Sequence, residues 1–439
     1  MKITSRQLAL DVIGKVVNQG AYSNIALDNA LSSSDLSPED SGLATEITYG
    51  TLKYLNTIDV ILSGHSKMPL NKLESTVLNI LRMSLYQLRY LDRIPDYAVI
   101  NEAVNMTKEV SPKASGFVNG ILRSYLRDNG EVRFRSKLEK LAFEYSFPLW
   151  MVKMLSASYK SRVEEILIGL NARPVVTYRV NTDRISRDEA VTLLEKEGFN
   201  AVPTKISPYG IEVRGGSAVL GNRLFTEGFL TVQDESSMLC APLLEPKEGK
   251  RYFDLCSAPG GKATHIAELA HDRANVIAFD IYDNKIKKIE ENKERLGLKG
   301  ISTRRQDATV FVKSYEGKGS VLLDAPCSGL GIIRKKPEIK YTKSERELED
   351  ITELQRKLLD TAKRYVEEEG YLVYSTCTLN PEENENNVRW FLENNPDFVP
   401  ERIDLGEFDN LLYTEEGFVT VLPNETMDGF FLARLKKRS

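Results

Sequence analysis

The sequence predicts a multidomain protein with an all-α N-terminal domain, a small α+β subdomain and a C-terminal α/β domain built on a doubly wound parallel sheet. Three successive hydrophobic patterns support this prediction. Apolar residues first repeat with a helical period, then alternate between strand-like and helical segments, and finally form regular strand–helix repeats. We therefore expect three domains, at residues 1–135, 136–228 and 229–439.

Composition and charge exclude several classes of protein. Of the 439 residues, 41% are hydrophobic, and 59 basic against 63 acidic residues give a net charge of -4. This balance provides no global attraction to nucleic acid, so such binding must use local basic patches. Four cysteines without a Cys-x-x-Cys pair and only three histidines argue against a metal site and a disulfide framework.

Targeting and membrane signals are weak. The start Met1-Lys-Ile-Thr-Ser lacks the apolar stretch of a signal peptide. The longest apolar segment, residues 77–91, is interrupted by Arg82, Gln87 and Arg89 and has the period of an amphipathic helix. We expect a cytoplasmic protein without membrane association. A monomer is expected because the sequence shows no exposed heptad stripe.

The first two predicted domains differ in period. Between residues 5 and 128 the apolar positions form helical stripes, and prolines mark the helix boundaries. The following segment contains strand-like runs at residues 175–180, 210–213 and 228–232 around a helical stretch at 187–197. These patterns predict an all-α unit followed by a small α+β module.

The third predicted domain places its chemistry after its strands. Four apolar, β-branched runs read as parallel strands, at residues 251–255, 274–280, 320–324 and 370–375. Because ligands of such sheets bind at the carboxyl ends of the strands, the residues that follow these runs are the candidates for a site.

A glycine-rich turn follows the first of these strands. In Asp254-Leu-Cys-Ser-Ala-Pro-Gly-Gly-Lys the two glycines lie between the strand and a helix, where the absence of a Cβ lets the backbone approach a ligand. The turn is therefore expected to bind a cofactor. The residues concerned are Cys256, Ser257, Ala258, Pro259, Gly260, Gly261 and Lys262.

Acidic residues end successive strands of the same sheet. Asp280 ends the second of these strands, where a carboxylate that accepts from both ribose hydroxyls is expected. Asp307, in Arg304-Arg-Gln-Asp-Ala, ends a further putative strand that precedes residues 320–324 and would face the adenine. A lone Gly-Gly would be an ordinary tight turn, but the strand-end acids favour a cofactor site. The absence of Gly-x-x-x-x-Gly-Lys-Ser/Thr and of a pyrophosphate cradle favours S-adenosyl-L-methionine over NAD or ATP.

Two cysteines follow the remaining two strands, Cys327 in Asp-Ala-Pro-Cys-Ser-Gly and Cys377 in Ser-Thr-Cys-Thr. A single buried thiol often serves only as a small apolar group, but two at strand ends beside a methyl donor indicate chemistry. A thiolate that adds to C6 of cytosine turns C5 into an enamine-like nucleophile, and a second group assists proton removal or release. Asp324 is the candidate to hydrogen-bond the base at N3, and spacing alone leaves open which cysteine attacks.

Three motifs in the same order resemble those of the RNA cytosine-5 methyltransferases. They are Asp254-x-Cys-x-Ala-Pro-Gly-Gly-Lys, Asp324-Ala-Pro-Cys-Ser-Gly-x-Gly and Ser375-Thr-Cys-Thr-Leu-x-Pro-x-Glu-Asn-Glu. The resemblance implies a Rossmann-like S-adenosylmethionine-dependent methyltransferase domain in which Cys377 is the nucleophile and Cys327 assists product release. It also implies cofactor contacts from residues 256–262, Asp280, Asp307 and Asp324.

The helical region carries a second resemblance. Arg93-Ile-Pro-Asp-Tyr-Ala-Val-Ile-Asn-Glu-Ala-Val and Gly116-Phe-Val-Asn-Gly-Ile-Leu-Arg are similar to the NusB-like RNA-binding fold. The combination of a NusB-like region with the methyltransferase motifs in one chain narrows the resemblance to the bacterial Sun/Fmu type. It implies methyl transfer to C5 of a specific cytosine in small-subunit ribosomal RNA through a covalent cysteine–C6 adduct.

Other interpretations concern the route of the RNA and the class of the protein. Several basic residues are interpreted as phosphate contacts, namely Arg334, Lys335, Lys336 and Lys340, together with Arg304 and Arg305. The α+β module that contains Arg179-Val-Asn, and the stretch Val232-Gln-Asp, are interpreted as lining an entry groove. A non-catalytic RNA-binding protein is the main alternative, although both motif cysteines are present. A cysteine hydrolase would need a histidine beside a thiol, and none of the three follows a predicted strand.

Overall fold

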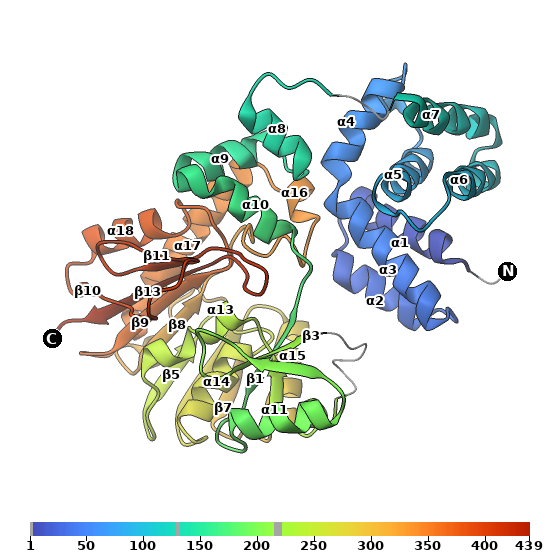
Figure 1. The fold of residues 1–439 in the computed structure, drawn as a ribbon. Coiled ribbons are helices and arrows are strands. Elements are labelled where there is room, and N and C mark those ends of the chain that lie inside the picture. The colour runs from blue at the N-terminus through green and yellow to red at the C-terminus, as the bar shows by residue number, and fades with distance from the viewer. Residues whose placement is uncertain (1–2, 129–131, 215–221) are drawn as a thin grey trace. The chain divides into compact units, whose positions relative to one another are not determined.

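The computed structural model describes residues 3–128, 132–214 and 222–439. The chain folds into two compact units, which are described separately below (Figure 1). One comprises Met1–Asn171 with the later segment Ile333–Lys343, and the other comprises Ala172–Ile332 with Ser344–Ser439. Within the described ranges, no helix combines the length and apolarity that crossing a bilayer requires.

The first unit is helical, as the sequence predicts. Helix α1 begins at a capping box in which Thr4 and Gln7 satisfy each other's backbone N–H groups, and it ends at Gly20, whose φ of 70° suits glycine. The helices are α1 (Ser5–Gln19), α2 (Ser23–Ser32), α3 (Pro38–Lys53), α4 (Leu55–His65), α5 (Ser75–Tyr90), α6 (Asp96–Val110), α7 (Ser115–Asp128), α8 (Lys137–Glu144), α9 (Leu149–Tyr159), α10 (Val163–Asn171) and, from the later segment, α16 (Ile339–Thr342).

The second unit contains the predicted small α+β subdomain, which is confirmed. Its four strands pair antiparallel in the order β2-β3-β1-β4. Helix α11 begins at a capping box of Ser186 and Glu189 and packs its Ala190 and Leu194 into the core of this sheet. The elements are β1 (Val176–Val180), α11 (Arg187–Lys196), β2 (Asn200–Pro203), β3 (Gly210–Arg214), α12 (Arg223–Thr226) and β4 (Leu230–Val232).

A nine-stranded sheet forms the rest of the second unit, in the order β11-β12-β13-β9-β8-β5-β6-β7, with β10 paired to β13. Neighbours among β5 to β9 are parallel, which confirms the predicted α/β domain. The strands are β5 (Arg251–Asp254), β6 (Asn275–Asp280), β7 (Ile301–Arg305), β8 (Ser320–Asp324), β9 (Tyr371–Thr376), β10 (Phe398–Glu401), β11 (Leu411–Tyr413), β12 (Val419–Val421) and β13 (Phe430–Lys437).

The sheet is mixed, whereas the sequence predicts a purely parallel one. Strand β13 runs antiparallel to β9 and carries β12 and β10 beside it, also antiparallel. In the described segment 398–437 no helix lies between β10, β11, β12 and β13, so loops connect these strands, and antiparallel pairing needs no crossover helix. A mixed sheet of this kind is common among large α/β folds.

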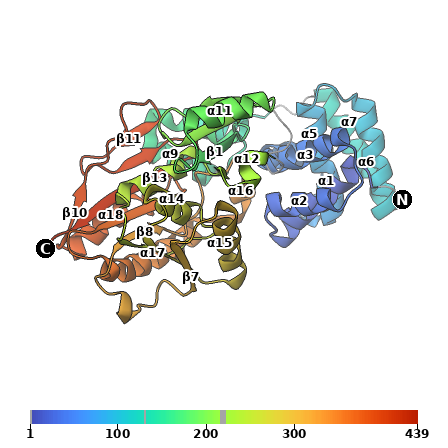
Figure 2. The ribbon, with the colours of Figure 1, turned by 90° about the horizontal axis from the view of Figure 1, so that it is seen from below.

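Helices cover both faces of this sheet (Figures 1 and 2). Helices α14 (Gly261–Leu269) and α15 (Asp283–Leu296) share a core with Leu322 and Val373, whereas α17 (Glu345–Tyr365) and α18 (Glu385–Asn394) share the opposite core with Val321 and Leu323. Adjacent strand residues thus point to opposite faces, as the pleat requires, and both faces are apolar.

The strand order determines where a site can form. From β5 the chain proceeds to β6 and β7 on one side, and then to β8 and β9 on the other. The order therefore reverses between β5 and β8, and in open α/β sheets the crevice outside such a reversal binds ligands. The loops after β5 and β8 carry the glycine turn and Cys327, so both lie at this point.

Candidate active site

The two motif cysteines meet at the carboxyl ends of neighbouring strands. The Sγ atoms of Cys327 and Cys377 lie 3.2 Å apart, and the backbone N–H of Gly331 donates to the Cys377 carbonyl at 3.0 Å. The hydrogen bond to Cys377, burial and nearby acidic groups together raise the pKa of the Cys327 thiol well above its ordinary value. Cys327 is therefore a neutral thiol beside the Cys377 sulfur.

Asp324 ends strand β8 and is fixed from two sides. Its Oδ2 accepts from Lys262 Nζ at 2.7 Å, and its Oδ1 accepts from the Ser375 hydroxyl at 2.8 Å. Burial alone would lower the pKa of Lys262, but neighbouring acidic groups, Asp324 foremost, bring that pKa above its ordinary value. The Lys262 ammonium also lies 5.5 Å from the centre of the Phe430 ring. Lys262 and Asp324 thus form a charged pair beside the cysteines.

The glycine turn requires glycine at its first position. Gly260 has a φ of 99°, and a Cβ there would approach Ile289 of α15 to 3.2 Å. Its N–H donates to the Ser257 carbonyl at 2.7 Å, while the Ser257 N–H donates to Phe279 of β6 at 2.9 Å. The Pro259 carbonyl accepts from Asn292 of α15 at 2.9 Å. The turn is thus tied to both β6 and α15.

Asp280, which the sequence suggests as a ribose-binding acid, lies against this turn. Its Oδ2 accepts from the Ala258 N–H at 3.3 Å and its Oδ1 from the Ile281 N–H at 2.8 Å, and Lys285 Nζ is 3.7 Å away. The residue is only 5% exposed. The carboxylate is therefore held beside the glycines by backbone donors that follow β5 and β6.

Asp307 and Cys256 have more ordinary surroundings. Asp307 Oδ1 accepts from the N–H of Thr309 at 2.9 Å and from its hydroxyl at 2.7 Å, which are the contacts of a local turn. Burial and then the nearby Asp254 raise the pKa of Cys256, so this thiol is packed and protonated. Neither set of contacts by itself indicates a ligand.

Asp254, the last residue of β5, was not among the predicted site residues. Its side chain is fully buried, and within the described residues neither carboxylate oxygen accepts a well-formed hydrogen bond. Burial raises its pKa to about 7, although the Ser257 hydroxyl and Lys262 oppose the shift. A buried carboxylate without a strong donor can accept a cationic ligand group. Its position at a strand end, like that of Asp280, is the feature of the sequence from which this site residue could have been predicted.

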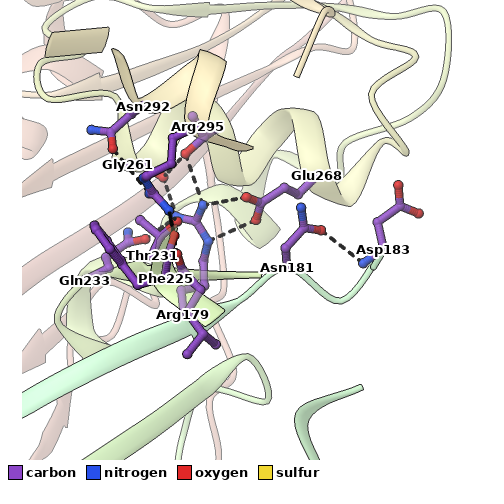
Figure 3. Close-up of polar contacts among 12 residues, drawn as sticks. Arg179, Asn181, Asp183, Phe225, Thr231, Gln233, Gly261, Glu268, Asn292 and Arg295 are labelled. Carbon is purple, nitrogen blue, oxygen red and sulfur yellow. Dashed lines mark hydrogen bonds and ion pairs between the residues drawn. The ribbon is translucent and has the colours of Figure 1, made fainter. Parts of the chain in front are cut away.

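Arg179 of β1 holds the helix that follows the glycine turn (Figure 3). The side chain is fully buried and makes a bidentate pair with Glu268 of α14, at 2.9 and 3.0 Å. It also donates to the Thr264 hydroxyl at 3.0 Å, to the Gly261 carbonyl and to the Gln233 side chain. The interpretation of Arg179 as a groove-lining residue is therefore wrong, because its guanidinium is buried and forms an ion pair with Glu268 inside the protein.

Lys340 is likewise not a phosphate contact. It is 1% exposed within the helical unit, where its Nζ donates to the Lys53 carbonyl at 3.0 Å and to Asn171 Oδ1 at 2.9 Å. Arg334 is also buried, whereas Arg305 is exposed and pairs with Asp283 at 3.0 Å. The basic run after the Pro-Cys motif therefore belongs in part to the helical core.

His265 does not assist a thiol. It is buried in α14 against Tyr209, with ring centres 4.8 Å apart, and within the described residues neither ring nitrogen has a hydrogen-bond partner. Burial and the nearby Arg179 keep its pKa well below the ordinary value. This histidine gives no support to the cysteine hydrolase alternative.

Comparison with known proteins identifies all three parts of the chain. The family model described as 16S rRNA methyltransferase RsmB/F matches residues 241–436, the NusB family model matches 3–127, and a ferredoxin-like domain of RsmF/B-like methyltransferases matches 147–220. These matches confirm the predicted NusB-like helical domain, the small α+β subdomain and the methyltransferase domain.

Relatives cover the whole chain. A protein of Bacillus subtilis named probable ribosomal RNA small subunit methyltransferase B is 36% identical over 100% of both chains, and an Escherichia coli protein named ribosomal RNA small subunit methyltransferase B is 33% identical over 99% of this chain and 98% of its own. A crystal structure of a methyltransferase homologue from Pyrococcus horikoshii is 25% identical with a TM-score of 0.62, covering 69% of this chain and 100% of its own. The chain belongs to the ribosomal RNA small subunit methyltransferase B family of S-adenosylmethionine-dependent methyltransferases.

Proposed function

We propose that this protein transfers a methyl group from S-adenosylmethionine to C5 of a cytosine in small-subunit ribosomal RNA, through a covalent bond between Cys377 and C6. The observation that carries the proposal is the 3.2 Å approach of Cys327 and Cys377 beside the pair of Lys262 and Asp324. The names of the curated relatives support the substrate class.

The environment of Cys327 supports different roles for the two sulfurs. A neutral Cys327 thiol can donate its proton in a hydrogen bond to Cys377, which favours Cys377 as the thiolate that attacks C6. The new S–C6 bond makes C5 nucleophilic, and S-adenosylmethionine would supply the electrophilic methyl group. Loss of the C5 proton then lets the S–C6 bond break, and Cys327 would assist that release.

Asp324 is proposed to orient the cytosine. Its carboxylate is held by Lys262 and Ser375, so it is fixed before the base arrives. Cytosine N3 accepts a hydrogen bond, so Asp324 would donate to it through a proton taken up from solvent when the base binds, while Lys262 keeps its own proton. That hydrogen bond would draw charge off the ring while the thiolate adds.

The residues after β5 and β6 fit the cofactor. The glycine turn, residues 256–262, would let the backbone approach it, and Asp280 would accept from its ribose hydroxyls. Asp254 would accept from its ammonium group, since this buried carboxylate lacks a strong donor. Asp307, which follows β7, is proposed to lie toward the adenine.

The test incubates radiolabelled S-adenosylmethionine and unmodified small-subunit ribosomal RNA with wild type, Cys377→Ala and Cys327→Ala. Wild type is expected to form 5-methylcytidine, Cys377→Ala to form none, and Cys327→Ala to remain attached to the RNA on a denaturing gel. RNA binding by wild type without methyl transfer would contradict the proposal and favour a non-catalytic RNA-binding protein.

A further inference from the structure

We infer that Glu383 is a positioning residue that fixes the two cysteine loops relative to each other. Glu383 lies seven residues after Thr376, the last residue of strand β9, in the loop that begins with Cys377, and its carboxylate accepts hydrogen bonds from both loops. The inference deepens the proposed function and rests on it, because the benefit of holding both sulfurs together depends on both sulfurs acting on one base.

The Cys327 loop is bound to Glu383 at the residue that follows the cysteine. The Ser328 N–H donates to Glu383 Oε2 at 2.8 Å, and the Ser328 hydroxyl donates to Oε1 at 2.5 Å. Two hydrogen bonds to one carboxylate fix the backbone and the side chain of Ser328 together. They therefore restrict the position of Cys327, which is covalently adjacent.

The Cys377 loop is bound to the same carboxylate directly through Asn380 and, at Thr378, the residue after the cysteine, indirectly through the Ser328 hydroxyl. The Thr378 hydroxyl lies 2.7 Å from the Ser328 hydroxyl, which itself donates to Glu383. Asn380 Nδ2 donates to Glu383 Oε1 at 3.1 Å, and the Asn380 N–H donates to the Thr378 hydroxyl at 3.3 Å. One carboxylate thus connects the residues that directly follow the two cysteines.

The surroundings make Glu383 rigid. The residue is fully buried, its carbonyl accepts from the Tyr374 hydroxyl at 2.7 Å, and Gln355 of α17 donates both to Glu383 Oε2 at 3.1 Å and to the Pro326 carbonyl at 2.9 Å. The four donors to the carboxylate are all neutral, and buried charge is retained only where such donors satisfy it. This arrangement spans β9, α17 and both cysteine loops.

The reaction gives this rigidity a purpose. Cys377 must reach C6 while Cys327 acts on the same adduct, so the distance between the sulfurs has to be set before the base enters. A displacement of about 1 Å in an aligned site can lower a rate by roughly 100-fold. Loosening either loop is therefore expected to lower kcat, whereas RNA affinity depends on other surfaces.

Glu383→Gln is the sharpest variant, since the amide keeps the shape but replaces one accepting oxygen by a donor. It loses the charge-assisted bonds to Ser328 and leaves a donor such as Asn380 facing another donor. Glu382→Gln is the matched control, because Glu382 is adjacent and exposed. Ser328→Ala is a second variant that removes the bridging hydroxyl while keeping Glu383, and thermal unfolding confirms that each protein is folded.

Two readouts are measured on the full-length protein. Methyl transfer under single turnover is expected to fall about 10- to 100-fold in Glu383→Gln and in Ser328→Ala, with KM for RNA within about twofold of wild type. The second readout uses no RNA. The azo oxidant diamide takes up the two thiol hydrogens and is reduced to its hydrazine as Cys327 and Cys377 form a disulfide, and mass spectrometry follows that bond. This cross-linking is expected to slow at least tenfold in both variants and to be unchanged in Glu382→Gln.

The two readouts separate this inference from the proposed function. If wild type transfers no methyl group to cytosine while cross-linking slows as expected, the proposed function fails and the positioning role stands. Wild-type rates of cross-linking and methyl transfer in folded Glu383→Gln and Ser328→Ala would overturn the positioning role. A rise in KM with unchanged kcat and cross-linking would also overturn it.

Discussion

A hydrogen bond and burial set the protonation of two groups at this site, Cys327 and Asp254. The hydrogen bond to Cys377 and burial keep Cys327 a thiol, and burial raises the pKa of Asp254 to about 7. The unfolded Asp254 ionises at 3.8, so between 3.8 and about 7 the folded protein binds the extra proton. The stability that this group contributes is therefore present at low pH and is lost as pH rises through 7.

The affinity for S-adenosylmethionine should depend on the same ionisation of Asp254, but it should increase as the pH rises. If Asp254 accepts from the cofactor ammonium, binding requires the carboxylate, and the Kd for S-adenosylmethionine should be about tenfold higher at pH 6 than at pH 8. Asp254→Asn should bind more weakly at pH 8 and should lack this rise. Calorimetric titration of wild type and Asp254→Asn with S-adenosylmethionine between about pH 6 and pH 8 measures this change in Kd. A rise of equal size in Asp254→Asn would assign the titration to another group.

Residue types and strand ends made the placement of the two cysteines, Asp280 and Asp324 at the carboxyl ends of the strands predictable from sequence, and their roles stay predictions. Asp254 and Glu383 were not predicted, because their importance depends on burial and on partners that lie in other loops. The Ser328 partner of Glu383, for example, is 55 residues away in the chain. Such a contact follows from the pairing of β8 with β9, which periodicity does not specify.

The ion pair of Arg179 and Glu268 joins β1 to α14 across the second unit. Both side chains are buried, at 0% and 3% exposure. Removing one partner of such a pair leaves an uncompensated charge, which costs about 3 to 5 kcal/mol, whereas replacing both by apolar residues is often nearly neutral. The pair therefore gives a test of how the subdomain supports the cofactor turn.

Arg179→Met is expected to lower the free energy of unfolding by about 3 to 5 kcal/mol, and the double variant Arg179→Met/Glu268→Leu to recover most of this loss. The exposed pair of Arg223 and Glu227 provides a control, since Arg223→Met should change stability by less than about 1 kcal/mol. Chemical denaturation measures these three variants and the single variant Glu268→Leu. A double variant as unstable as the sum of its single substitutions would refute this account of the pair.

Elements with a clear pattern were predictable, including the strands β5, β6, β8 and β9. The antiparallel extension was not predicted, because β11 and β12 contain only three residues each and no helix separates them. Arg179 was misread for a related reason. Its partners lie 54 to 89 residues away, and a strand arginine looks the same in sequence whether it faces solvent or an acid.

The segment Ile333–Lys343 follows the Cys327 loop but packs within the helical unit. Glu338 Oε2 accepts from the Ser23 hydroxyl at 2.7 Å, and Lys340 Nζ lies 3.8 Å from the centre of the Phe147 ring. The chain therefore passes between the two units three times, after residues 171, 332 and 343. In the sequence this segment appears only as a basic run. Its packing in the helical unit could not be predicted, because it depends on contacts such as that of Ser23 with Glu338, which are 315 residues apart.

Lys340 should make the stability of the protein depend on pH. Burial lowers its pKa well below 10.5, so between the lowered value and 10.5 the unfolded chain binds the extra proton. Stability should rise with pH through this window and level off above 10.5. Lys340→Met should remove that rise, and Lys67→Met, at an exposed position, should retain it. Thermal unfolding between pH 7 and about 10 measures the difference, and identical profiles for wild type and Lys340→Met would contradict the assignment.

The order of the three parts was predictable for the whole molecule because period, motifs and resemblance agree. The limits at residues 135 and 228 stay predictions. Helices α8 to α10, beyond residue 135, pack with the helical unit, and β4, beyond residue 228, pairs with β1 in the small sheet. Boundaries depend on which elements share a core, and local sequence does not report that.

The most direct test of the central claim is to isolate the RNA complex of Cys327→Ala, digest both components and locate the nucleotide by mass spectrometry. The account predicts a 5-methylated pyrimidine bonded to the sulfur of Cys377. A nucleotide on Cys256 or Cys240, or wild-type methylation of RNA by Cys377→Ala with no adduct, would contradict it.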